Sequence, residues 1–245
     1  MVTVARTRPK LRSPRPGSPP ASRTKRLLVK AGRLSSQNAI YGFLGVFNYV
    51  HLGWWLKRKN FPMEAVVESR ERVLEEVAAA VRGQRVLYLE FGVADGYSMR
   101  HWSRLLDHAG SRLHGFDSFE GLPAEWALGW SAGSFSPPGG VPEFDDDRIE
   151  LFQGWFTDTL PQYSWPEDYE QLVVNVDCDL YASADYVLRE IEERITPGTV
   201  LYFDEFHHYA DELRAFDELL QRTSWRFEIL AASQDFSQIA FRRVG

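Results

Sequence analysis

The stretch 85-RVLYLEFGVADGYS-98 joins a short apolar run to a turn that contains two glycines. The run is rich in residues that favour strands. The segment that follows, residues 97–110, has helical spacing of its apolar residues and stops at a glycine. A strand that turns into a helix is the repeating unit of parallel sheets covered by helices. The stretch therefore predicts an α/β fold.

The same alternation continues to the end of the chain. We expect further strands within 112–119, 148–156, 171–180 and 199–206, and a closing strand pair within 226–244. We expect further helices within 62–83, 182–198 and 210–223. This pattern predicts a Rossmann-like, mostly parallel central sheet with helices on both faces and an antiparallel closing strand.

The charge of the chain is unevenly distributed. Residues 1–34 hold ten of the 28 Lys and Arg and none of the 34 Asp and Glu, so residues 35–245 have a net charge of −16. An acidic body argues against nucleic acid as the main partner. Residues 1–34 are also rich in Pro, Ser and Arg, which predicts a disordered arm. A solvated tail and an arm that touches a polyanion both remain open.

A nearly continuous apolar and aromatic run covers residues 37–56 and is followed by Lys57, Arg58 and Lys59. We assign residues 35–60 to an aromatic helical segment and 61–245 to the main domain. Three interpretations remain open: a helix over the mouth of a site or in a homo-oligomer interface, a helix on a membrane surface through residues 25–59, and a membrane span. Asn48 and His51 weaken the span.

Cys178 is the single cysteine of the chain, so an internal disulfide is excluded. A lone thiol fits a reducing compartment, and we expect a cytoplasmic protein, with membrane association as the alternative. Strand alternation turns Cys178 away from its two acidic neighbours, which predicts a small core residue.

Ligands of doubly wound sheets bind beyond the carboxyl ends of the strands, so the residues that follow each strand are candidates for a site. Gly92 and Gly96 form the turn after the first strand, and we expect a side chain on either to push a ligand off the backbone. Asp117 follows the second strand about 20 residues later, where an acid can accept ribose hydroxyls. A turn or helix-cap aspartate is the alternative. Together these features fit a nucleoside cofactor, and the spacing matches neither a dinucleotide fingerprint nor a P-loop.

Two further strands end in acidic residues. Asp177 and Asp179 follow an apolar run, and extended geometry would put them on one side. Asp204 and Glu205 follow the last parallel strand, directly before His207 and His208. Helix capping and structural histidines are the alternatives to a role in chemistry.

Residues 120–148 form a long insert rich in Gly, Pro, Trp and Ser. A surface loop and a lid or substrate-binding segment both remain open. Its aromatic residues Trp126, Trp130 and Phe135 could stack on a sugar face or anchor a lid.

Five motifs occur in order: EFGVADGYS at 90–98, DSFEGLP at 117–123, GWFTDTLP at 154–161, DCDLY at 177–181 and PG at 197–198. In these motifs the chain resembles the macrocin O-methyltransferase family of class I S-adenosylmethionine-dependent enzymes. The resemblance covers about residues 85–206, and GWFTDTLP is its most specific part.

The resemblance implies methyl transfer from S-adenosylmethionine to a hydroxyl of a small molecule, a sugar or a glycosylated secondary metabolite. It implies that Asp179 is the base and that a divalent metal, usually magnesium, is held by Asp177, Asp204 and Glu205. The cofactor-binding residues that it implies are Glu90, Phe91, Gly92, Gly96, Ser98, Asp117, Ser118, Gly154, Trp155 and Asp177, with Phe156 packing near the adenine.

Glu205 departs from the family, which usually has a second aspartate at that position. This departure leaves open a metal-independent methyltransferase with His207 or His208 as base. Separately, residues 25–59 leave open a membrane-associated nucleoside-binding module without catalysis.

Overall fold

The computed structural model describes residues 20–126 and 129–245. The chain divides into two compact units, residues 1–45 and 46–245. The disorder predicted for residues 1–19 lies outside the described residues.

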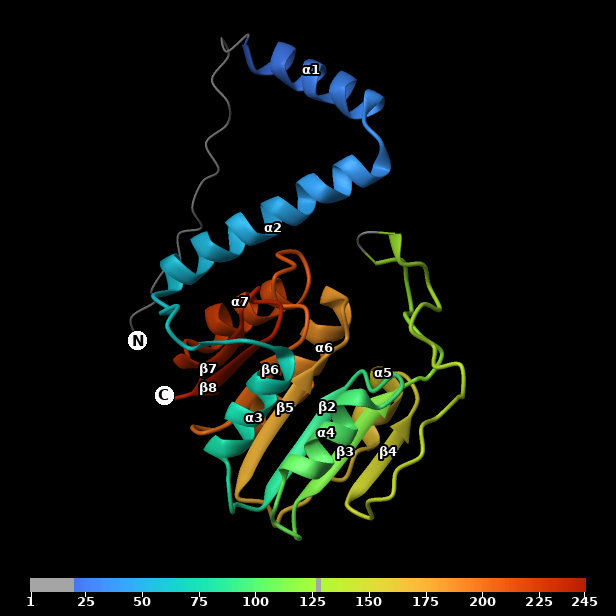
Figure 1. Ribbon diagram of the computed structural model, residues 1–245, viewed down its shortest axis with the longest axis vertical. Helices are drawn as coiled ribbons and strands as arrows, with labels where there is room; N and C mark the ends of the chain where they lie inside the picture. The colour runs from blue at the N-terminus through green and yellow to red at the C-terminus, as the bar shows by residue number, and fades with distance from the viewer. Residues whose placement is uncertain (1–19, 127–128) are drawn as a thin grey trace, which may run out of the picture. The chain divides into compact units, whose positions relative to one another are not determined.

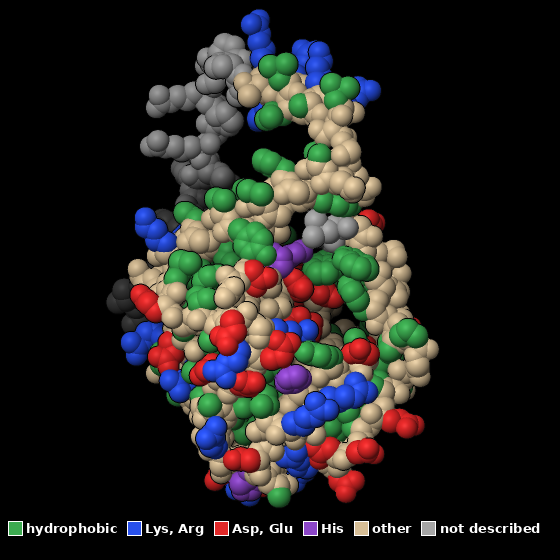
Figure 2. Space-filling model, in the orientation of Figure 1, with side chains coloured by type: hydrophobic (Ala, Val, Ile, Leu, Met, Phe, Trp, Pro, Cys, Tyr) green, Lys and Arg blue, Asp and Glu red, His purple; other side chains and the backbone are tan. Residues whose placement is uncertain are grey.

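Residues 20–34, which the sequence assigned to the disordered arm, form helix α1 (Pro20–Leu34). Proline is well suited to the first helical position, and Ala, Leu, Lys and Arg are strong helix formers. Leu27, Leu28 and Leu34 are all exposed, so the segment has no core of its own, as the composition indicated. Figure 2 shows blue Lys and Arg side chains along it. The segment therefore forms a helix although it buries few apolar side chains.

Helix α2 (Gln37–Lys59) confirms that the aromatic run is helical. In the second unit it buries Asn48, Leu52, Trp55 and Leu56. The Trp55 indole donates a 2.7 Å hydrogen bond to Asp217, which fixes this end of α2 to the helix that carries Asp217. No helix in residues 20–126 and 129–245 combines the length and the apolar character that crossing a membrane requires. Contact with a membrane surface and homo-oligomer formation stay predictions.

The central sheet of the described residues has the strand order β1-β7-β8-β6-β5-β2-β3-β4. Neighbouring strands are parallel except where β8 pairs with β6 and β7. The Rossmann-like sheet with an antiparallel closing strand is therefore confirmed. The strands are β1 (Val66–Val67), β2 (Val86–Phe91), β3 (Arg112–Asp117), β4 (Ile149–Gln153), β5 (Gln171–Val176), β6 (Val200–Phe203), β7 (Phe227–Ser233) and β8 (Ile239–Arg243).

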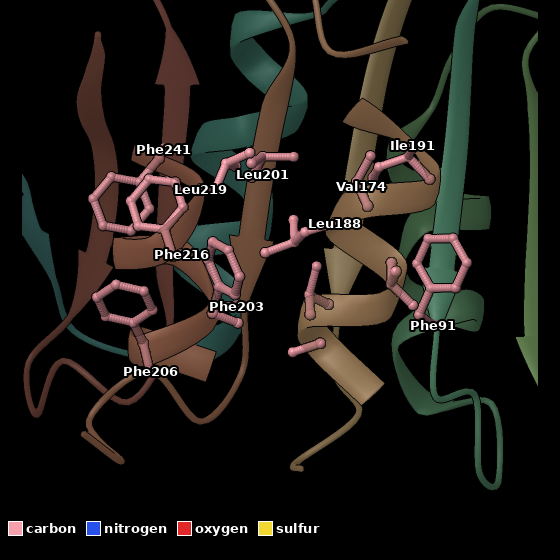
Figure 3. Packing of buried hydrophobic residues seen from close by; sticks show 14 of the residues in the cluster. Phe91, Val174, Leu188, Ile191, Leu201, Phe203, Phe206, Phe216, Leu219 and Phe241 are labelled. Carbon is pink, nitrogen blue, oxygen red and sulfur yellow. The ribbon is translucent and has the colours of Figure 1, made fainter. Parts of the chain in front are cut away.

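Helices cover both faces of the sheet, as Figure 1 shows. They are α3 (Arg70–Ala80), α4 (Tyr97–Leu105), α5 (Phe156–Thr159), α6 (Tyr181–Glu190) and α7 (Glu212–Thr223), with 3₁₀ turns η2 (Leu160–Gln162) and η3 (Glu192–Arg194). Side chains of β2 alternate between two cores. Leu87, Leu89 and Phe91 pack with α6, α7 and the end of α2, and Figure 3 shows Phe91, Leu188 and Phe216 in this core. Tyr88 packs on the other face with α3 and α4.

The helix predicted within 62–83 begins later than expected. The Ser69 side chain accepts a hydrogen bond from the Arg72 amide and caps α3, so Arg70 is its first residue. Residues 66–67 instead form β1, which pairs in parallel with β7 at the edge of the sheet. This strand and the cap together set the direction in which α3 enters the fold.

Candidate functional site

A cavity of about 600 Å³ opens beyond the carboxyl ends of β2, β3, β5 and β6. This is where ligands bind in doubly wound sheets. Eleven residues predicted for the site line it: Glu90, Gly92, Ser98, Asp117, Ser118, Gly154, Trp155, Asp177, Asp179, Asp204 and Glu205. Four others lie outside the lining: Phe91 in the core, Gly96 at the start of α4, and His207 and His208 after β6.

The two glycines of the turn serve the protein's own packing. Gly92 has φ +97°, and a Cβ there would lie 1.7 Å from the Asp177 carbonyl oxygen. A Cβ on Gly96, at φ +82°, would lie 2.6 Å from the Phe144 ring. The expectation that side chains here would push a ligand away is therefore corrected, since they would first meet the backbone after β5 and the insert. Of these two contacts, the one at Gly92 is with a backbone atom, which cannot move aside, whereas the one at Gly96 is with a side chain.

Gly92→Ala is expected to lower the free energy of unfolding by about 2 kcal/mol or more, because the new methyl meets a carbonyl and the positive φ adds strain. Thermal unfolding measures the change. Gly83→Ala is the matched control, since Gly83 has a positive φ of +74° but no atom within 4 Å of an added Cβ. An equal loss in both variants would contradict a role for the close approach at Gly92.

Asp117 holds the glycine turn in place. Its Oδ2 accepts 2.8 Å hydrogen bonds from the Val93 and Ala94 amides, and its Oδ1 accepts one of 2.7 Å from the Phe119 amide. Each carboxylate oxygen retains acceptor capacity beyond these bonds. The side chain therefore orders the loop between β2 and α4 while it lines the cavity.

Glu90 is a buried carboxyl group at the end of β2. Tyr88 donates a 2.7 Å hydrogen bond to it, and Asn175 in turn donates to the Tyr88 hydroxyl at 3.2 Å. Burial raises the pKa of Glu90 to about 8, against the opposing effects of Tyr88 and Arg70. Near neutral pH this group is therefore mainly a proton-bearing donor.

Arg70 is the basic side chain of the cavity lining in the described residues, and no motif pointed to it. Its Nη2 donates to Ser98 at 2.8 Å and to Asp177 at 3.2 Å, and its Nε lies 3.1 Å from Asp204 Oδ1. Burial opposes its charge, but Asp204 and Asp177 outweigh burial and raise the pKa of Arg70. The guanidinium therefore stays charged between two carboxylates.

Asp177 and Asp179 both line the cavity, but not through strand geometry. Strand β5 ends at Val176, and Asp179 has a left-handed φ of +58°. Such a conformation in a residue other than glycine is strained and is often found at functional sites. Burial, with Glu205 and Asp204 adding to it, raises the pKa of Asp179 to about 7. Cys178 between them is buried and belongs to the core, as predicted. The expectation that it turns away from its acidic neighbours is corrected, because Cys178 lines the same cavity and the strand already ends at Val176.

The three carboxylates predicted to hold magnesium do not converge on one point. Arg70 lies between Asp177 and Asp204, and the Tyr202 hydroxyl also donates to Asp204 at 2.9 Å. Magnesium requires a compact set of oxygen ligands. The donor set of Asp177, Asp204 and Glu205, with a guanidinium already in place, does not fit that ion.

The two histidines lie beside Glu205, away from the lining. His207 Nδ1 is 3.5 Å from Glu205 Oε2, and His208 Nδ1 is 3.7 Å from Asp211 Oδ2. Burial and the neighbouring His208 lower the pKa of His207 to about 4. His207 is therefore neutral near pH 7, and neither histidine belongs to the cavity lining.

The insert contributes aromatic walls to the cavity. Trp126 and Phe135 line it, and the Trp126 indole donates a 3.1 Å hydrogen bond to Asp211. Trp130 is 46% exposed and packs against Phe135, with ring centroids 4.8 Å apart and ring planes tilted by 42°. The insert is therefore part of the site wall rather than a plain surface loop.

Comparisons with known proteins bear on the fold and the class of the domain. Residues 89–206 match a family model described as a methyltransferase domain. No curated protein matches the chain. Among solved structures, the chain is similar to the calicheamicin methyltransferase CalS11, with a TM-score of 0.56 and 22% identity, over 92% of this chain and 93% of that one. It is also similar to the O-methyltransferase NovP, with a TM-score of 0.55 and 20% identity, over 71% and 80%.

The apo structure of CalS11, described as a TDP-rhamnose 3′-O-methyltransferase, has a TM-score of 0.50 and 21% identity, over 92% of this chain and 95% of that one. At these identities the solved structures establish the fold. The fold, the cavity at its strand ends and the domain match together define the class: the chain is a methyltransferase, with its methyltransferase domain at residues 89–206.

Proposed function

We propose that the protein transfers the methyl group of S-adenosylmethionine to a hydroxyl oxygen of a small molecule, a sugar or a glycosylated secondary metabolite. One observation carries this proposal: Asp179, a strained residue whose carboxyl pKa burial raises to about 7, lines the same cavity as the glycine turn after β2. The similarity to a sugar O-methyltransferase and the resemblance to the macrocin family support the acceptor class.

In the proposed reaction, the acceptor oxygen attacks the methyl carbon and forms the new C–O bond. The bond from the methyl carbon to the cofactor's sulfur breaks, and the sulfur keeps the electron pair. The hydroxyl proton passes to Asp179, whose pKa suits a base that works near neutral pH. The protein otherwise contributes alignment of the two reactants.

The charges of the cavity support a cationic cofactor. Six carboxyl groups line it, namely Glu90, Asp117, Asp177, Asp179, Asp204 and Glu205, against the single guanidinium of Arg70 in the described lining. S-adenosylmethionine carries a sulfonium and an ammonium group, which the ionised carboxylates of this lining attract. Glu90 does not add to that charge, because it is mainly protonated near neutral pH. Asp117 would accept from the ribose hydroxyls with the acceptor capacity that its amide bonds leave.

No step of this mechanism uses magnesium, because Arg70 already forms ion pairs with both Asp177 and Asp204. The acceptor hydroxyl would instead be oriented by Asp179 and by the aromatic wall of Trp126 and Phe135. Apolar ring faces suit the C–H faces of a sugar.

The pH dependence of turnover is expected to follow the ionisation of the Asp179 carboxyl group. A base must be unprotonated, so kcat/KM should rise with pH through about 7 and level off above it. A rate profile between pH 5.5 and 9 with saturating cofactor measures this. A profile that stays flat across pH 6 to 8 would contradict Asp179 as base.

The acceptor class is tested with S-adenosylmethionine that carries a deuterated methyl group. The protein is incubated with a panel of nucleotide sugars, glycosides, phenols and amines, and products are analysed by mass spectrometry and NMR. The proposal predicts a label on a sugar oxygen. A label found only on nitrogen, or only on phenols, would contradict it.

A further inference from the structure

We propose that Glu205, His207 and His208 form a binding site for a divalent first-row transition ion. Each side chain offers one donor atom, and in the described residues these atoms lie within 4.8 Å of one another. Donors bound at about 2.0–2.2 Å to one ion must lie this close together. The site differs from the predicted magnesium set, with which it shares only Glu205.

His207 has a ring nitrogen that finds no hydrogen-bond partner among residues 20–126 and 129–245. Its Nδ1 is buried without a hydrogen-bond partner, and it lies 3.5 Å from the Glu205 carboxylate. The ring is held by Tyr49 of α2, whose plane is within 9° of parallel at a centroid distance of 5.1 Å. A buried nitrogen without a partner is unusual in a folded protein. An ion between His207 and Glu205 would satisfy it.

His208 has the surroundings of a metal-binding imidazole. Its Nδ1 lies 3.7 Å from Asp211 Oδ2, and Asp211 is itself fixed by hydrogen bonds from the Trp126 indole and the Tyr181 amide. A carboxylate behind the imidazole is the usual outer partner of a histidine ligand. This arrangement leaves Nε2 of His208 as the donor atom for the ion.

The donor types select the ion. Two imidazole nitrogens and one carboxylate suit zinc or a neighbouring transition ion, whereas magnesium prefers oxygen ligands alone. Three protein ligands leave a coordination position for water or for an oxygen of a bound molecule. Because Glu205 also lines the cavity, the ion would stand at the edge of the site.

The test uses the full chain, stripped with EDTA and dialysed, and does not depend on methyl transfer. Zinc chloride and magnesium chloride are titrated by calorimetry, and cobalt chloride is followed by its visible absorption. His207→Gln and Glu205→Gln remove donors. His101→Gln makes the same change on α4, outside the cluster, and Asp177→Asn tests the carboxylate set. Circular dichroism and thermal unfolding check that each variant is folded.

The proposal predicts one zinc ion per chain, cobalt bands typical of nitrogen ligands, and no comparable magnesium binding. Zinc affinity should fall in His207→Gln and Glu205→Gln by more than the roughly 10- to 100-fold loss that follows removal of an outer partner. It should stay unchanged in His101→Gln and Asp177→Asn. Absence of zinc binding, equal binding in His207→Gln, or a loss confined to Asp177→Asn would overturn the proposal.

Discussion

Asp179→Asn is expected to lower kcat by about 100- to 10,000-fold, the range that a general base contributes. The amide keeps the size of the side chain but cannot take the acceptor's proton. Binding of S-adenosylhomocysteine should stay unchanged, since no proton moves when that product binds. Steady-state kinetics and calorimetry measure the two effects separately.

Asp168→Asn is the matched control for this change, because Asp168 is exposed and pairs with Arg112 away from the cavity. It should leave both quantities unchanged. Full turnover in Asp179→Asn would remove Asp179 as the base. If His207→Gln then lost turnover, the histidine alternative would replace it.

Arg70→Met is expected to lower the free energy of unfolding by up to about 3 kcal/mol, the lower end of the range for buried ion pairs, because 27% of the Arg70 side chain is exposed. Methionine fills a similar volume but leaves Asp177 and Asp204 without the cation that now lies 3.2 and 3.1 Å from them. Burial already raises the pKa of Asp177 and Asp204. The loss in free energy of unfolding should therefore be smaller at pH 6, where these carboxylates can take up protons, than at pH 8.5. Chemical denaturation at the two pH values measures this.

Arg72→Met is the matched control, two residues along α3. Arg72 pairs with Glu75 and Glu76 on the helix surface, with 42% of its side chain exposed, and such pairs contribute little. Arg70→Met combined with Asp204→Asn should recover part of the lost stability. Equal stability of the two single variants would contradict the buried role of Arg70.

The fold was predictable because each strand and helix carries a local signal. The apolar run before Gly92 and the helical spacing after Gly96 are independent of distant contacts. The carboxyl ends of parallel strands meet at one edge, so acids at the strand ends were expected together. This reasoning placed Asp117, Asp177, Asp179 and Asp204 around one cavity, as found.

What could not be predicted depends on contacts between distant segments. The need for Gly92 comes from the Asp177 carbonyl, 85 residues later in the chain. Arg70 sits in the first turn of α3, where the helix dipole disfavours a cation, and that misfit was the one local signal of its role. The ion pairs of Arg70 with Asp177 and Asp204 also explain why the predicted magnesium ligands do not form a compact set.

The central claim is that the cavity beyond β2 and β3 holds S-adenosylmethionine. Calorimetric titration with S-adenosylmethionine and S-adenosylhomocysteine, each with EDTA and with added magnesium, tests it most directly. Micromolar binding of both, unchanged by EDTA, is the predicted result, because Arg70 rather than a magnesium ion pairs with Asp177 and Asp204. Absence of binding by folded protein would contradict the account, and the glycine turn and Asp117 would then have structural roles alone.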